Sequence, residues 1–286
     1  MKRILTAVVL IPIVLVLVFL GPKWQGLFTL AVAGVSLLAG WEYLGLTERC
    51  GAKPPKLLVM GALVNLFAFN YAWPEDTAAI FCLLSLGIVI YCMFMRPVYG
   101  MIADTSSSIF CLVYTGLTLT ALTALRAQGN GASLVMFLLL VIWIGDTAAY
   151  YVGRMMGRHK LAPSLSPGKS WEGAIASAAG SVLVAAALVS LAGLEQTSDF
   201  LGTVLQRADI APLSYPDEAW YWLVLAFLVN AAGQVGDLAE SALKRSANVK
   251  DSGELLPGHG GVLDRIDALL LAAPVLLYVQ VIHQRF

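Results

Sequence analysis

The sequence predicts an all-α, polytopic integral membrane protein, a helical bundle of about nine transmembrane helices. Of the 286 residues, 59% are hydrophobic and only 13% are charged, whereas a soluble domain carries about 25% charged residues. Mean hydropathy is +0.79. Apolar runs of about 20 residues, the length that crosses a bilayer, recur along the whole chain. A lipid bilayer is therefore the solvent that fits this composition.

The apolar runs give the expected spans in order. The first follows Met1, Lys2 and Arg3 and resembles a signal peptide, but it is long and no small-residue cleavage site follows it, so a retained helix is expected. The nine expected spans cover residues 4–20, 24–46, 57–73, 77–95, 107–126, 132–152, 172–193, 219–240 and 266–282. Eight or ten spans stay open as alternatives.

Lysine and arginine predict the orientation, because the cytoplasmic loops of membrane proteins carry an excess of both. With nine spans and a cytoplasmic N-terminus, 14 of the 18 lysine and arginine residues fall on the cytoplasmic side. The net charge of zero gives no basic surface for nucleic acid, so none is expected as a partner.

Polar residues are distributed unevenly along the chain. Residues 1–130 have short, sparse loops and are predicted to form an N-terminal transmembrane scaffold. Residues 131–286 contain two dense polar stretches, 145–173 and 233–267, both on the predicted cytoplasmic side. We therefore predict that residues 131–286 form a C-terminal transmembrane catalytic half.

The stretch 233–267 begins as a continuation of the eighth span. Asp237, Ser241 and Lys244 are spaced i, i+4 and i+7, which puts them on one face of a helix. Asp237 lies near the end of an apolar run, where an ionisable group is costly unless it faces a cavity, a partner or an ion. For Asp237 alone, a helix-end acid solvated by lipid headgroups is the simpler interpretation.

Two further carboxylates stand at the start of the last span. Asp264 and Asp267 are spaced i, i+3 and share a helical face. Such carboxylates suit Mg²⁺, which binds one or two of them together with substrate phosphate oxygens. An alternative for either acid is that it complements the helix dipole. The spacing of 27 residues between Asp237 and Asp264 lets two antiparallel helices bring the acids together.

A glycine pair and several cations complete this stretch. Gly260 and Gly261 follow His259, and their amides could cradle a phosphate or the base ahead of a helix N-terminus. An ordinary tight turn is the alternative. The cations in the same stretch are Lys244, Arg245, Lys250 and Arg265. Metal-binding acids, cations and a glycine turn together predict phosphoryl or nucleotidyl transfer.

The stretch 145–173 supplies second-tier candidates. Asp146 lies inside a span as a possible polar or metal ligand, and Ser166 and Lys169 lie in a polar loop that could contact phosphate or anionic headgroups. Gly168, Lys169 and Ser170 resemble the end of a P-loop. That motif needs a glycine at position 163, where this chain has Pro163. It also needs a preceding strand, and no strand is expected here.

The pattern from Ser241 to Asp267 resembles the signature of the phosphatidate cytidylyltransferases, also called CDP-diacylglycerol synthases. No position departs from that signature, and residues 145–146 and 166–173 resemble the second polar region of the family. The fixed positions that match are Ser241, Lys244, Arg245, Lys250, Asp251, His259, Gly260, Gly261, Asp264, Arg265 and Asp267.

The resemblance implies that CTP and phosphatidate react to CDP-diacylglycerol and pyrophosphate. It also implies an enzyme of phospholipid synthesis in a bacterial-type inner membrane, dependence on Mg²⁺ with a second cation left open, and a homodimer. On this interpretation Asp237, Asp264 and Asp267 form the metal centre and act in catalysis with Lys250, His259 and Arg265. The expected substrate contacts are Lys244, Arg245, Gly260, Gly261, Ser166, Lys169, Ser241 and Asp146.

Two rival functions are open to test. An ion-coupled transporter also has intramembrane acids and broken helices, but it predicts inverted repeats and charges at the bilayer midplane. The sequence shows no repeat, and its charges gather at one membrane face. A CDP-alcohol phosphotransferase would need an acid-rich motif of the DGxxAR type, which is absent.

Overall fold

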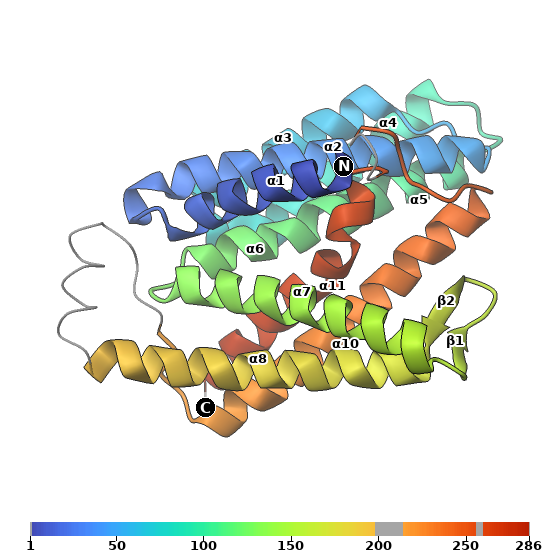
Figure 1. Cartoon of the computed structure of the whole chain (residues 1–286). Helices are drawn as coiled ribbons and strands as arrows, with labels where there is room; N and C mark the ends of the chain where they lie inside the picture. Colours follow the sequence, from blue (N-terminus) through green and yellow to red (C-terminus); the bar gives the residue numbers. More distant parts are fainter. Residues whose placement is uncertain (1, 198–213, 256–259, 286) are drawn as a thin grey trace. The chain divides into compact units, whose positions relative to one another are not determined.

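The structure is a computed structural model that describes residues 2–197, 214–255 and 260–285 (Figure 1). Helices dominate the described residues, as the apolar runs predict. Their bounds are α1 Lys2–Phe19, α2 Gln25–Arg49, α3 Lys56–Ala72, α4 Thr77–Met95, α5 Met101–Cys111, α6 Thr118–Arg126, α7 Gly131–Met156, α8 Trp171–Thr197, α10 Ala219–Ser246 and α11 Leu263–His283. Short 3₁₀ turns occupy Pro22–Trp24 and Pro74–Asp76, and a π-helical segment, η3, occupies Leu112–Leu117.

The helices confirm the predicted fold class, an all-α polytopic bundle with about nine helices. Among the described residues, seven helices are long and apolar enough to cross a membrane. In the span Pro74–Met95, only 11% of the most apolar stretch is buried within the chain. So large an uncovered apolar surface fits contact with lipid, because soluble monomers rarely expose one. The protein is an integral membrane protein.

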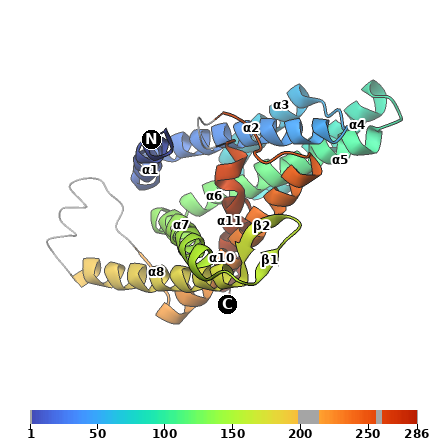
Figure 2. The ribbon, with the colours of Figure 1, turned by 45° about the vertical axis from the view of Figure 1, so that its right-hand side comes forward.

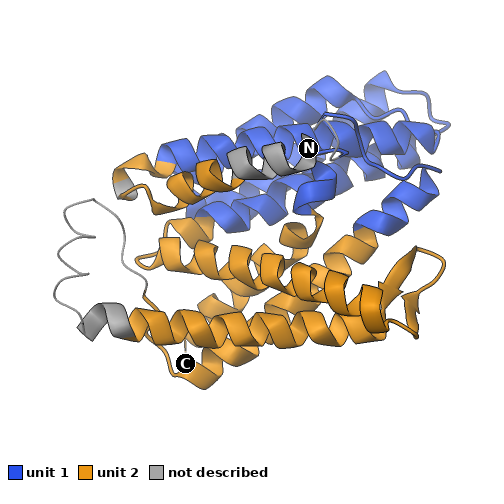
Figure 3. Cartoon of the chain, viewed as in Figure 1, with its two compact units in different colours: residues 1–3, 26–123, 240–266 blue, residues 4–25, 124–239, 267–286 orange. Residues whose placement is uncertain are grey.

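The chain forms two compact units, and each is built from separate parts of the sequence (Figure 3). Unit 1 comprises residues 1–3, 26–123 and 240–266. Unit 2 comprises residues 4–25, 124–239 and 267–286. The helices α10 and α11 each contribute to both units. The predicted division into a scaffold and a catalytic half at residue 130 concerns function and stays a prediction.

Unit 1 packs α2 to α5 around a core of leucine and aromatic side chains. Tyr43 of α2 contacts the rings of Phe110 and Tyr114, with centroids 5.5 Å and 6.1 Å away. The π-helical segment η3 lies beside α2, and the buried Ser36 hydroxyl donates a 2.6 Å hydrogen bond to the carbonyl of Thr115. This bond satisfies a carbonyl in an irregular stretch of helix, where hydrogen bonding is weakened.

Unit 2 contains the long helices α7 and α8, joined by a β-hairpin that both ribbon views show beside the end of α7 (Figures 1 and 2). Strand β1, Lys160–Ala162, pairs antiparallel with β2, Ser166–Ser170, with Lys160 opposite Ser170. The expectation of a loop without a strand was wrong, because the turn at residues 163–165 folds the flanking residues into a ladder. The P-loop is still excluded, since Gly168, Lys169 and Ser170 lie inside β2.

Candidate functional site

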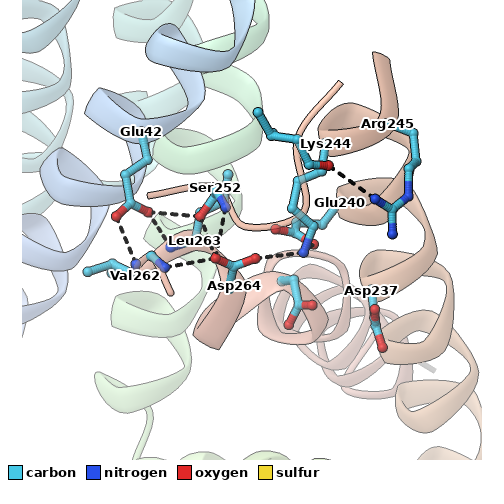
Figure 4. A network of polar contacts seen from close by, with 12 residues as sticks. Glu42, Asp237, Glu240, Lys244, Arg245, Ser252, Val262, Leu263 and Asp264 are labelled. Carbon is cyan, nitrogen blue, oxygen red and sulfur yellow. Dashed lines mark hydrogen bonds and ion pairs between the residues drawn. The ribbon is translucent and has the colours of Figure 1, made fainter. Parts of the chain in front are cut away.

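A buried ion-pair network stands where α10 meets the start of α11 in unit 1 (Figure 4). Lys244 Nζ lies 2.6 Å from Asp264 Oδ1 and 2.5 Å from Glu240 Oε2. The side chain of Glu240 is 0% exposed, that of Asp264 5% and that of Lys244 14%. Helical spacing puts Glu240 one turn before Lys244, so both reach Asp264 from the same face of α10. Lys244 therefore neutralises carboxylates of its own protein.

The second oxygen of Asp264 organises the loop that precedes α11. Asp264 Oδ2 accepts hydrogen bonds from the backbone N–H of Ser252 at 2.9 Å and of Gly261 at 2.8 Å. The Ser252 hydroxyl lies 2.8 Å from the same oxygen. Gly260 adopts a φ of +78°, the left-handed conformation that glycine tolerates best. The Gly261 N–H, which the sequence predicts to contact substrate, thus donates its hydrogen bond to Asp264.

Glu42 of α2 caps the N-terminus of α11. Its carboxylate accepts the backbone N–H of Val262 at 3.0 Å and of Leu263 at 2.8 Å, and Figure 4 shows it directed at both. The first N–H groups of a helix lack partners within the helix and carry positive partial charge, so a carboxylate there is doubly favourable. Glu42 is 5% exposed.

Unit 2 contains a separate set of charged residues. Lys169 of β2 forms an ion pair with Asp237 of α10, with Nζ and Oδ2 2.7 Å apart. Asp146 of α7 interacts electrostatically with both. The hairpin that carries Lys169 is held to α8 by His159, whose Nδ1 lies 2.7 Å from Glu172 Oε1. The arrangement joins acids from α7 and α10 to a lysine from β2.

Within unit 2, α10 and α11 approach closely beside Asp237. A Cβ added to Gly236 would lie 2.5 Å from the backbone oxygen of Asp267, so only glycine permits this distance. Asp267 Oδ1 accepts the N–H of Ala268 at 2.8 Å. This packing brings the backbone of α10 at Gly236 next to that of α11 at Asp267, while the expected meeting of Asp237 with Asp264 stays a prediction.

The described residues allow a test of the expected metal centre. Among them, no group of three or more His, Cys, Asp or Glu side chains is arranged to hold a metal ion. Two carboxylates, from Asp237 and Asp267, match the demand of Mg²⁺, which leaves its remaining positions to water and substrate. Both oxygens of Asp264 are used by Lys244, Ser252 and Gly261. The assignment of Asp264 as a metal ligand stays a prediction.

The other candidates occupy accessible positions. Ser241 is half-buried on α10, and Ser166 is half-buried at the start of β2. Exposed side chains belong to Arg245, Lys250, Asp251 and Arg265. Arg245 also donates a hydrogen bond to the carbonyl of Val249 at 3.2 Å. His259 lies outside the described residues, so its predicted catalytic role stays a prediction.

Three residues of the network are not among those predicted from the sequence: Glu42, Glu240 and Ser252. Both glutamates lie inside apolar runs, and an acid in such a run needs a partner or a cavity. Their position in apolar runs is thus the same signal that singles out Asp237. Ser252 gives no comparable signal, because serine beside glycine is typical of any loop.

A polar cavity of about 530 Å³ lies elsewhere in unit 2, between the loop before α7, the segment before α10 and the end of α11. None of the predicted site residues lines it. The lining residues are Gln128, Gly129, Asn130, Ser214, Pro216, Asp217, Gln280 and Gln284. Since these positions lie at the opposite ends of α7, α10 and α11 from the charged residues, the cavity is no part of the candidate site.

Comparisons with known proteins identify relatives along the whole chain. The sequence model described as the Cytidylyltransferase family matches residues 1–283. A phosphatidate cytidylyltransferase of Brucella suis is 35% identical over 96% of this chain and 90% of its own. Proteins of the same name from Haemophilus influenzae and Bacillus subtilis are each 30% identical, over 97% of this chain and 97% and 96% of theirs.

Proposed function

Because the chain belongs to the cytidylyltransferase family, we propose that it transfers CMP from CTP to phosphatidate, which gives CDP-diacylglycerol and pyrophosphate. The observation that carries this proposal is the match of the family's sequence model to residues 1–283. Relatives named phosphatidate cytidylyltransferase align with nearly the full chain as well. The protein is accordingly a nucleotidyltransferase of phospholipid biosynthesis. The signature from Ser241 to Asp267 supports the same reaction.

In the proposed reaction, a phosphate oxygen of phosphatidate attacks the α-phosphorus of CTP, and pyrophosphate leaves. A phosphate monoester is already nucleophilic near neutral pH, so the protein needs no strong base. Its contribution is to position two anionic substrates and neutralise their charge. The exposed cations Arg245, Lys250 and Arg265 are suited to the phosphates. Lys244 instead holds Asp264 and Glu240 in place, so its effect on substrate is indirect.

The resident cation that we propose is Mg²⁺, held by Asp237 and Asp267. Two points support this choice of ligands. The helices α10 and α11 approach each other closely at Gly236, and Mg²⁺ prefers one or two carboxylate ligands. When bound, the ion would neutralise phosphate oxygens and polarise the phosphorus that is attacked. Lys169 already pairs with Asp237 at 2.7 Å and compensates its charge before a cation binds.

The proposal places the site at the cytoplasmic face of a bacterial inner membrane, where CTP is found. The excess of lysine and arginine in the expected cytoplasmic loops supports this orientation. The homodimer implied by the family resemblance is a further proposal, which chemical cross-linking in native membranes would test: a dimer band is expected, and a monomer alone would contradict it.

One assay tests the proposed function. Purified protein in detergent is given radiolabelled CTP, phosphatidate and Mg²⁺, and both pyrophosphate and labelled lipid are measured. We expect release of pyrophosphate in step with formation of CDP-diacylglycerol. Diacylglycerol in place of phosphatidate is the matched control and should give no product, because it lacks the attacking phosphate. A monodisperse sample without activity would exclude the assignment.

A further inference from the structure

We propose that Glu42, which lies in the predicted scaffold, is a positioning residue for cytidylyl transfer. Its carboxylate holds the two described segments that flank residues 256–259 between α10 and α11, one of which carries Lys250 and the other Gly260 and Gly261. The inference rests on the proposed function, in which this loop meets the phosphates of CTP. It assigns a part in the reaction to a helix that has no signature residue.

Direct hydrogen bonds from Glu42 support this role. Its two carboxylate oxygens accept the N–H of Val262, directly before α11, at 3.0 Å and that of Leu263, the first residue of α11, at 2.8 Å. Since these residues lie more than 200 positions away in the sequence, the bonds attach the start of α11 to α2. The direction of α11 at its first turn therefore depends on a side chain of a distant helix.

Ser252 extends the attachment into the loop. Its hydroxyl lies 3.2 Å from Glu42 Oε2 and 2.8 Å from Asp264 Oδ2. A hydroxyl has one proton, so it donates to one carboxylate at a time, and the backbone N–H of Ser252 holds Asp264 independently at 2.9 Å. The result is a chain of polar contacts from α2 through Ser252 to Asp264 and then to Lys244 (Figure 4).

The packing around Glu42 leaves little room for another arrangement. A Cβ on Gly253 would lie 2.5 Å from Glu42 Oε1, and one on Gly261 would collide with the carboxylate and with Ser252. Glu42 is 5% exposed, so water cannot replace its hydrogen bonds. If the carboxylate becomes an amide, one buried N–H at the start of α11 faces an NH₂ group and loses its acceptor.

A purely structural cap would also stabilise the protein, so the test must separate positioning from folding. Loss of folded protein lowers the apparent kcat in proportion to the active fraction, but leaves KM unchanged. A displaced loop instead weakens the contacts made to CTP and raises the KM for CTP. The KM for phosphatidate serves as an internal reference within the same sample.

The experiment compares Glu42→Gln with Glu48→Gln in full-length protein in detergent micelles. Glu48 is a matched control, because it also lies on α2 but pairs with Lys56 near the surface and is 45% exposed. For Glu42→Gln we expect the KM for CTP to rise about 10-fold, with the KM for phosphatidate within about twofold, as for a lost substrate contact. Glu48→Gln should match the wild type.

Amide hydrogen exchange of the same samples measures local opening of the segments near Glu42, and it does not depend on enzyme activity. Peptides that cover residues 247–255 and 260–264 should exchange at least about tenfold faster in Glu42→Gln, because the lost bonds allow local opening. Ser252→Ala removes the bridging hydroxyl alone and should cause a smaller change in the same direction. It is the second variant if Glu42→Gln fails to fold.

Two results would overturn the inference. One is a KM for CTP in Glu42→Gln equal to that of Glu48→Gln, and the other is unchanged exchange and KM in Ser252→Ala. An inactive but folded wild type has a different meaning, since it removes the proposed function itself. An active wild type with normal variants removes only the role of Glu42.

Discussion

Lys169 and Asp237 form an ion pair, with Nζ and Oδ2 2.7 Å apart, that joins the β-hairpin to α10 within unit 2. It connects the two polar stretches of the sequence, 145–173 and 233–267. Asp237 keeps 38% of its side chain exposed, so the pair is accessible to solutes. The charge of Asp237 is therefore compensated while its carboxylate stays available to a cation.

The pair predicts non-additive effects of substitution. Asp237→Asn should lower kcat/KM by about 100-fold or more, because it removes a proposed ligand of Mg²⁺, and Lys169→Gln by about 10-fold, because it removes the cation that pairs with that carboxylate. The double variant should be no worse than Asp237→Asn alone, since residues in contact act as a unit. Lys160→Gln, in the same hairpin, is the control and should retain activity. Additive losses in a double-mutant cycle would contradict a shared role.

Asp267→Asn should weaken the response to Mg²⁺. We expect the Mg²⁺ concentration for half-maximal activity to rise at least about 10-fold, because a carboxylate ligand is replaced by a neutral amide. Titration of activity with Mg²⁺ measures this shift. Asp217→Asn is the control, since Asp217 pairs with His283 at the other end of the helices at 3.0 Å. An unshifted titration would remove Asp267 from the metal site.

Lys244 and Lys250 should differ in what they support. Lys244→Met leaves Glu240 and Asp264 buried without their cation, and such a loss costs about 3–5 kcal/mol of stability. Lys250 is exposed, so Lys250→Met should keep the unfolding transition of the wild type but lose turnover. Thermal and denaturant unfolding in detergent check both. Equal stability of the two variants would show that the buried network is not stabilised by Lys244.

Gly236→Ala should destabilise unit 2. The new Cβ would lie 2.5 Å from the Asp267 backbone oxygen, and forcing the helices apart costs about 1–3 kcal/mol. Gly87→Ala on α4 is the matched control, because nothing lies within 4 Å of a Cβ there. Its alanine should be neutral or stabilising by up to about 1 kcal/mol. The measurement is the unfolding midpoint of each variant. Equal midpoints for Gly236→Ala and Gly87→Ala would mean that α10 and α11 do not pack closely at Gly236.

The orientation is testable with cysteine labelling. In a background without the four native cysteines, a cysteine at position 160 should be protected from a membrane-impermeant reagent in intact cells, and one at position 199 should react. The positive-inside distribution of charge is the reason. Equal labelling of both positions from outside would defeat the predicted topology.

Hydropathy was sufficient to predict the helices, because each span must match the thickness of the bilayer by itself. The predicted span 77–95 coincides with α4, and 4–20 lies within two residues of α1. The hairpin could not be predicted from hydropathy, because β1 and β2 are short and polar. The π-helical segment at Leu112–Leu117 left no local signal either, since the hydroxyl that donates to its Thr115 carbonyl comes from Ser36 on another helix.

The sequence by itself determined a membrane-embedded helical protein and the group of charged residues that we propose as its site. Both follow from local properties, since an apolar run or a short motif is recognisable wherever it stands. Only the tertiary structure decided how those charges are used. Asp237 pairs with Lys169, whereas Asp264 is enclosed by Lys244, Ser252 and Gly261, and Glu42 anchors a loop more than 200 residues away. The physical reason is that a buried carboxylate needs specific donors, and the fold brings those donors together from distant parts of the chain.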